Sequence, residues 1–152
     1  MVKHDVPLVV VADPDPASQQ QMVQALSSSC RCLVTHTLRE TYAVLQQERP
    51  ALLILELDQP DGDGLGLIPI LQEDLQLRSI LIACLTTRTA VHEKIQACCA
   101  GADDVLVKPL IPAMQFSVRM RLLLRTGHSA RAVIGAADTA VQARSPGEGK
   151  AP

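Results

Sequence analysis

The segment from Pro50 to Gly64 constrains the fold of this chain most strongly. It opens with residues 51–55, an unbroken apolar run that is typical of a strand buried on both faces. Glu56 ends this run, and a turn segment rich in Asp, Gly and Pro follows. Strands of this kind belong to parallel sheets, which bind ligands at the C-terminal ends of their strands. We therefore expect Glu56 to lie at a ligand-binding rim.

Strand and helix patterns alternate on both sides of this segment. Short joins between such elements require a parallel sheet with right-handed crossovers and helices on both faces. The sequence therefore predicts one doubly wound α/β domain over residues 1–126, with a last helix at about 112–125. Residues 127–152 are rich in Ala, Gly and Pro, so we expect a flexible tail there. The expected strands are residues 8–12, 32–36, 51–55, 80–85 and 105–107.

Two of the expected helices carry specific predictions. Pro69 lies deep in a helix that would begin at Gly64, and a proline there removes a backbone donor and clashes one turn back. This helix should therefore kink or start late. In the next helix, Val91, Ile95 and Cys98 have the spacing of one apolar stripe, which predicts that they face the core.

Composition excludes several classes of protein. The formal net charge of −2 argues against a general binder of nucleic acid or anionic membranes. No apolar run approaches the ~20 residues of a membrane span, and the N-terminus lacks the apolar core of a signal peptide. We therefore expect a cytoplasmic protein. Five cysteines lack zinc spacing and are expected to be reduced, buried thiols: Cys30, Cys32, Cys84, Cys98 and Cys99.

Four polar residues follow or end the strands of the predicted sheet and should share one rim: Asp13, Glu56, Thr86 and Lys108. Two carboxylates, a hydroxyl and an ammonium group suit a cation together with a phosphoryl group. No glycine-rich phosphate loop, nucleophile elbow or dinucleotide fingerprint appears in the sequence. We therefore expect a binding or signalling protein and not an enzyme.

The sequence resembles the receiver domain of two-component response regulators over about residues 6–125. The resemblance rests on the segments VVVADPDP, PALLILELDQPDGDGL, LTTR and AGADDVLVKP. It implies a flavodoxin-like (βα)5 fold with strand order 2-1-3-4-5. By position, it also implies that Asp13 is the first acid of a Mg²⁺-binding pair, that Thr86 supplies the hydroxyl of the fourth strand, and that Lys108 is the lysine after the fifth strand.

Three positions depart from the family pattern. Glu56 stands where the family has its phosphoacceptor aspartate, Pro14 replaces the second metal-binding acid, and Val105 replaces the aromatic switch residue. The extra carbon of glutamate moves the carboxylate by ~1.5 Å. Proline removes both a charge and a ligand for a hard cation. The candidates for a weakened Mg²⁺ site are then Asp13, Glu56 and Asp58, and we expect no other cofactor.

These departures predict a pseudo-receiver in which Glu56 and Lys108 form a fixed ion pair and signalling does not wait for phosphorylation. Asp15 replaces the missing acid only in part, because its side chain is expected to point elsewhere. The alternatives are a relic ion pair without a signalling role and an ordinary Mg²⁺-dependent receiver that accepts phosphoryl groups from a histidine kinase. The resemblance implies a protein partner, namely a histidine kinase, a downstream effector or a second copy. The contacts would use the fourth helix, fifth strand and fifth helix.

Overall fold

A computed structural model describes residues 6–110 and 113–127. Five strands form one sheet in the order β2-β1-β3-β6-β7, and all neighbouring strands are parallel. This order is the predicted 2-1-3-4-5, because β6 and β7 are the fourth and fifth strands of this sheet. The intervening β4 and β5 pair only with each other, as a hairpin with two residues in each strand. The strands are β1 (Leu8–Ala12), β2 (Arg31–Thr35), β3 (Leu52–Glu56), β4 (Asp58–Gln59), β5 (Gly62–Asp63), β6 (Leu81–Thr86) and β7 (Asp104–Val107).

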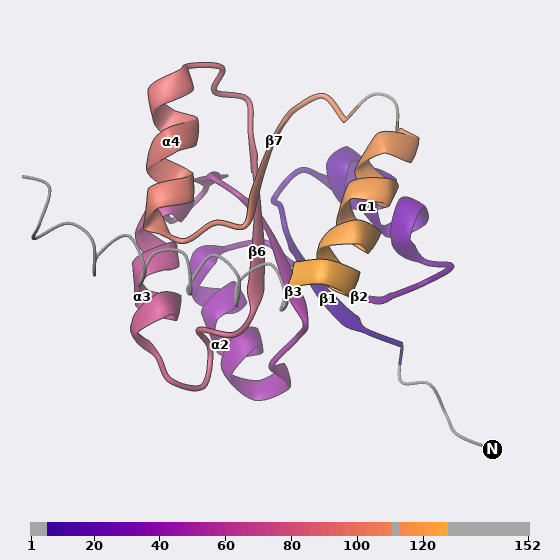
Figure 1. Cartoon of the computed structure of the whole chain (residues 1–152), viewed down its shortest axis with the longest axis horizontal. Helices are drawn as coiled ribbons and strands as arrows, with labels where there is room; N and C mark the ends of the chain where they lie inside the picture. Colours follow the sequence, from indigo (N-terminus) through magenta and orange to yellow (C-terminus); the bar gives the residue numbers. More distant parts are fainter. Residues whose placement is uncertain (1–5, 111–112, 128–152) are drawn as a thin grey trace, which may run out of the picture.

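Helices cover both faces of the sheet (Figure 1). On one face, α1 and the C-terminal helix bury Met22, Leu26, Phe116 and Met120 against the sheet. On the other face, α2, α3 and α4 pack against the opposite side chains of the same strands. The predicted doubly wound fold is therefore confirmed. The helices are α1 (Pro16–Leu26), α2 (Leu38–Glu48), α3 (Leu67–Glu73), α4 (Val91–Ala100) and the C-terminal helix, residues 113–127.

The late start predicted for the third helix is present. A 3-10 turn, η1 (Gly64–Gly66), precedes α3, and Pro69 is the third residue of α3. At this position in the first turn, the missing N–H of proline costs no intrahelical hydrogen bond. Asp63 accepts a hydrogen bond from the Leu65 backbone N–H at 3.0 Å and so caps the turn.

The stripe predicted for α4 faces the wrong way. Val91 and Ile95 are 69% and 56% exposed, and Cys98 is exposed as well. Ala97 is fully buried instead, and Ala100 packs against the same core cluster. The helix thus approaches the sheet through small residues and leaves its larger apolar side chains outside. Helical spacing identifies an apolar stripe, but it does not decide which stripe meets the sheet when a helix has two.

The burial expected for the cysteines holds in part. Cys30 and Cys84 are buried and Cys32 is half-buried, but Cys98 and Cys99 are exposed on α4. All five thiols are free. The exposure of Cys98 and Cys99 follows from the orientation of α4.

The C-terminal helix extends to residue 127, one residue past the expected domain boundary. The tail expected after it, at residues 128–152, lies outside the described residues. Within residues 6–110 and 113–127, no helix combines the length and the apolar character that a membrane crossing requires.

Candidate functional site: an acidic pocket closed by a lysine

Four neighbouring strand ends place the predicted residues at one rim. Asp13 follows β1, Glu56 ends β3, Thr86 ends β6, and Lys108 follows β7. Since β1, β3, β6 and β7 are consecutive in a parallel sheet, their C-terminal ends meet at the same edge. Asp13 is fully buried and Glu56 is 4% exposed. Two carboxylates thus lie almost out of reach of solvent.

The ammonium group of Lys108 lies between these carboxylates. Its Nζ is 2.6 Å from Oδ2 of Asp13 and 3.3 Å from Oε2 of Glu56. The expected ion pair with Glu56 is therefore present, but Asp13 is the closer partner, which the sequence reasoning did not anticipate. The Lys108 side chain is 14% exposed. A largely buried cation thus bridges two buried anions.

Burial and charge act in opposite directions on these groups. Burial raises the pKa of Glu56, and the positive charge of Lys108 offsets only part of this rise. Burial lowers the pKa of Lys108, but the contact with Asp13 and the charges of Glu56 and Asp13 outweigh it, so the pKa of Lys108 is raised overall. Lys108 is therefore held in its charged form.

The loop after β1 does not supply a second acid to the pocket. The backbone N–H of Asp15 donates to Oδ1 of Asp13 at 2.9 Å. The side chain of Asp15 turns away and caps α1, because its Oδ2 accepts hydrogen bonds from the backbone N–H and hydroxyl of Ser18 at 3.2 and 2.8 Å. These hydrogen bonds lower the pKa of Asp15. The Asp15 side chain therefore stabilises α1 and points elsewhere, as the sequence suggested.

The carboxylate of Asp58, the third predicted metal ligand, pairs with a basic side chain. Its Oδ1 contacts Nη2 of Arg88 at 2.6 Å, and Nη1 of the same guanidinium lies 3.3 Å from Oδ2 of Asp63. The hydrogen bond with Asp58 is the main reason that the pKa of Arg88 is raised. Arg88 thus links the loop after β6 to the β4–β5 hairpin. Among the described residues, no group of three or more His, Cys, Asp or Glu side chains has the arrangement of a metal site.

The hydroxyl of Thr86 is directed to the loop after its own strand. Its Oγ1 accepts a hydrogen bond from the backbone N–H of Arg88 at 2.9 Å. Thr86 is nearly fully buried. It lies at the predicted rim, and its hydrogen bond with Arg88 orders the β6–α4 loop.

Comparisons with known proteins identify the family. The family model described as the response regulator receiver domain matches residues 9–116. The chain belongs to the response regulator receiver family. Among curated relatives, the transcriptional regulatory protein PmrA of Pectobacterium parmentieri is 31% identical over 120 residues, which are 77% of this chain and 52% of PmrA. The KDP operon regulator KdpE of Escherichia coli is 32% identical over 123 residues, with 80% and 52% covered.

Solved structures show the same receiver fold. The response regulator DrrB, an OmpR/PhoB homologue of Thermotoga maritima, superposes with a TM-score of 0.72 at 19% identity and covers 80% of this chain and 54% of DrrB. The receiver domain of a histidine kinase from Syntrophus aciditrophicus gives 0.71 at 22% identity, with 78% and 90% covered. The receiver spans about half the length of the curated relatives that it matches.

Sequence reasoning missed two side chains that shape the rim of this receiver. Gln59 donates from Nε2 to the backbone oxygens of Ala12 and Glu56 at 3.0 and 2.8 Å, and so ties the end of β1 to the end of β3. Arg88 was the other omission. The signal for Arg88 in the sequence was its spacing. Arg88 lies two residues after Thr86, the last residue of β6, and its partner Asp58 lies two residues after Glu56, the last residue of the neighbouring β3. No comparable pattern marks Gln59.

The position of the expected aromatic switch holds a packed aliphatic residue. Val105, in β7, is half-buried and packs against the core cluster beneath α2, α3 and α4. A valine has one side-chain torsion and no ring, so it offers no second position of comparable reach.

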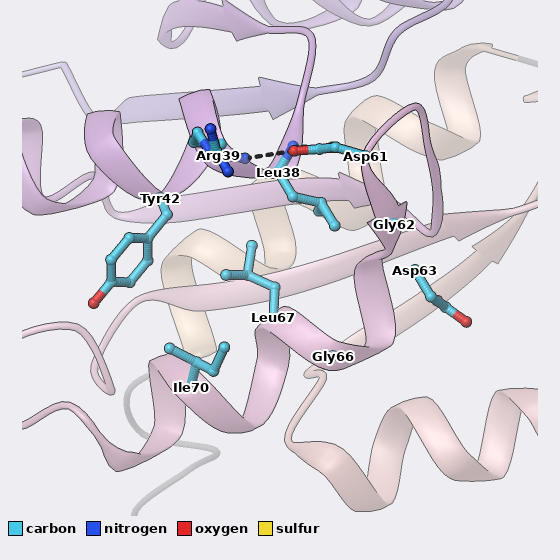
Figure 2. A pocket seen from close by; sticks show the side chains of 9 residues that line it. All are labelled: Leu38, Arg39, Tyr42, Asp61, Gly62, Asp63, Gly66, Leu67 and Ile70. Atoms are coloured by element: carbon cyan, nitrogen blue, oxygen red, sulfur yellow. Dashed lines mark hydrogen bonds between the residues drawn. The ribbon is translucent and has the colours of Figure 1, made fainter.

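A hollow of the receiver lies between α2 and α3, and Asp13, Glu56 and Lys108 do not line it. It has a volume of about 480 Å³ and is lined by Leu38, Tyr42, Leu67 and Ile70 with the β4–β5 turn. Figure 2 shows the carboxylate of Asp61 facing the first turn of α2. This carboxylate accepts hydrogen bonds from the backbone N–H groups of Leu38 and Arg39 at 2.8 and 3.0 Å. Asp61 therefore fixes the β4–β5 turn to the start of α2.

Proposed function

We propose that this chain is a pseudo-receiver that signals by binding a protein partner in a conformation independent of aspartyl phosphorylation. The observation that carries the proposal is the contact of Lys108 with both Glu56 and Asp13, at 3.3 and 2.6 Å. This contact fixes the side chain at the phosphoacceptor position in a buried ion-pair network before any phosphoryl donor arrives.

The chemistry of phosphoryl transfer supports the proposal. In-line transfer needs the acceptor oxygen in place, and a misplacement of ~1 Å costs about a hundredfold in rate. The extra methylene of Glu56 moves the carboxylate by ~1.5 Å relative to aspartate. Pro14 has no carboxylate, and the side chain of Asp15 caps α1. The pocket therefore offers a phosphoryl group neither the usual acceptor nor the usual acidic pair.

The exposed apolar residues next to the edge strand β7 support a protein partner. Val91 and Ile95 on α4 are more than half exposed, and Met114, Val118 and Leu122 of the C-terminal helix are 75%, 55% and 49% exposed. Exposed apolar residues of this size are common in protein-binding surfaces. We infer that α4, β7 and the C-terminal helix form the surface that binds a histidine kinase, a downstream effector or a second copy of the chain.

The proposal is tested by offering the chain a phosphoryl donor. The purified chain is incubated with Mg²⁺ and acetyl phosphate, and separately with beryllofluoride, while intact mass and backbone amide shifts are recorded. We expect no stoichiometric mass change and no amide shift centred on residue 56. Stoichiometric modification, or a Mg²⁺-dependent shift at residue 56, would favour the second candidate, an ordinary phosphoaccepting receiver. The presence of Thr86 and Lys108 at their family positions is the observation that favours this candidate.

A partner test addresses the surface separately. Pull-downs with the unmodified chain and with an Ile95→Ser variant compare capture of cognate kinase or effector candidates, and sedimentation tests self-association. We expect binding without a phosphoryl donor and a loss of binding in the variant. Binding that appears only after treatment with a phosphoryl donor would contradict the proposal.

A further inference from the structure

We infer that the ammonium group of Lys108 takes the place of a divalent cation in this pocket, so that the folded chain neither needs nor binds Mg²⁺ there. The inference concerns the charge balance of the pocket and does not depend on which partner the chain binds. It rests on the position of Lys108 between Asp13 and Glu56 and on what surrounds these carboxylates.

The first step is the cost of the buried carboxylates. Oδ2 of Asp13 and Oε2 of Glu56 are both shielded from solvent, and among the described residues neither oxygen has a hydrogen-bonding partner other than Lys108. Two uncompensated carboxylates in such a site are strongly unfavourable, because burial removes their hydration and their charges repel. Nζ of Lys108 lies within ion-pair distance of both of these oxygens. The lysine therefore supplies the positive charge that the pocket requires.

The second step is the ligand set that remains. Mg²⁺ demands nearly octahedral coordination by oxygen, with carboxylates and waters around it. On Asp13, Oδ1 accepts the backbone N–H of Asp15 and Oδ2 faces Lys108. Asp15 caps α1, and Pro14 has no ligand to offer. While Lys108 holds Oδ2 of Asp13 and Oε2 of Glu56, the oxygens that remain around the pocket do not fit a divalent cation.

The third step is the neighbouring carboxylate that could complete such a site. Asp58 pairs with Arg88 at 2.6 Å, and this guanidinium also contacts Asp63. The predicted metal-binding acids are thus each paired with a basic side chain of the chain itself, Asp13 and Glu56 with Lys108 and Asp58 with Arg88. A divalent ion would have to displace Lys108 and Arg88 in order to bind these acids.

The experiment compares the thermal unfolding of three proteins with and without millimolar MgCl₂, against NaCl of equal ionic strength. They are the wild-type chain, Lys108→Met, which keeps a long unbranched side chain and removes its charge, and Lys108→Arg, which keeps the charge. We expect the Tm of the wild type and of Lys108→Arg to be unchanged by MgCl₂. We expect Lys108→Met to melt lower in NaCl and to gain about 3–6 °C when Mg²⁺ reaches tenfold its Kd.

Two further measurements keep the test decisive. The double variant Glu56→Gln/Lys108→Met removes one buried carboxylate together with the lysine, so it should fold without Mg²⁺ and lose the response to it. If Lys108→Met is unfolded in NaCl, circular dichroism should show that MgCl₂ restores its helices. A rise in the Tm of the wild type with MgCl₂, or a Lys108→Met variant that ignores Mg²⁺, would overturn the inference. Because no phosphoryl donor is present, these outcomes are independent of the phosphorylation test.

Discussion

Lys108 lies closer to Asp13 than to Glu56: Nζ is 2.6 Å from Oδ2 of Asp13, against 3.3 Å from Oε2 of Glu56. The carboxylate after β1 is therefore the main counterion of the lysine. Glu56, at the phosphoacceptor position, is the secondary one. Substitutions of the two acids should consequently have unequal effects on stability.

Asp13→Asn should destabilise the fold more than Glu56→Gln. Removing the nearer partner leaves the largely buried ammonium with Glu56 alone, at 3.3 Å, and breaking a buried ion pair costs about 3–5 kcal/mol. Glu56→Gln leaves the Asp13–Lys108 pair intact. It also removes a carboxylate whose burial is unfavourable, because burial raises the pKa of Glu56. We expect that variant to lose less than about 1 kcal/mol. Urea unfolding measures both free energies, and equal losses or the reverse order would contradict this ranking.

Phosphorylation should return most fully when aspartate is restored at both position 14 and position 56. Glu56→Asp brings back the shorter acceptor, but Pro14 still supplies no carboxylate. We expect Pro14→Asp/Glu56→Asp to be modified by acetyl phosphate with Mg²⁺, and the single Glu56→Asp variant to react at least about tenfold more slowly. Intact-mass time courses measure both rates. Equal rates for the two variants would show that position 14 is unimportant.

Arg88→Ala should loosen the β6–α4 loop with little effect on global stability. The variant loses the contacts with Asp58 and Asp63, whose side chains are about half exposed, and pairs of this kind contribute less than about 1 kcal/mol. Hydrogen exchange should be faster for the backbone of residues 87–90. Arg39→Ala, on the exposed side of α2, is the control. Unchanged exchange in Arg88→Ala would mean that the loop is ordered by other contacts.

The stability contributed by Asp61 should depend on pH. Hydrogen bonds from the backbone N–H groups of Leu38 and then Arg39 lower the pKa of Asp61 from its ordinary value of 3.8. A carboxyl group whose pKa is lowered by folding stabilises the protein above its ordinary pKa, and this contribution is lost as the pH falls through the folded-state value. Asp61→Ala should therefore be less stable than the wild type near neutral pH, and the difference should shrink below pH 3.8. Denaturant unfolding across this range checks the trend, with Glu73→Ala as a surface control.

The two faces of α4 should differ in how strongly substitution changes the stability of the fold. Ala97 is fully buried against the sheet, so Ala97→Leu should overpack the core and cost about 1–3 kcal/mol. Ile95 is 56% exposed, so Ile95→Ser should change stability by no more than about 0.5 kcal/mol. Thermal unfolding compares the two variants. A larger loss for Ile95→Ser would place that residue in the core and contradict the orientation of α4.

The fold could be predicted from the sequence because the expected strands, helices and connections all favour the same arrangement. The apolar run of β3 predicts a central buried strand. The short connections between alternating strands and helices are consistent with a parallel sheet. Pro69 likewise predicted the late start of α3 from backbone sterics alone. Such features depend on neighbours along the chain, which the sequence displays directly.

The unpredicted features depend on distances across the fold. The alternation of apolar residues in α4 fits two orientations, and only close packing at Ala97 selects one. The preference of Lys108 for Asp13 over Glu56 depends on where a flexible four-carbon chain ends between two strands. The bridge from Gln59 to the ends of β1 and β3 has no motif at all, because any residue of suitable length at a turn could make it.

The positive charge between Asp13 and Glu56 is part of the polypeptide and does not come from the medium. A bound ion exchanges with solution, whereas Lys108 is joined to the chain by covalent bonds and is present once per molecule. We therefore expect chelators such as EDTA, and depletion of Mg²⁺ from the medium, to leave the partner of these two acids unchanged. The charge balance of this pocket is completed when the polypeptide is synthesised and folded.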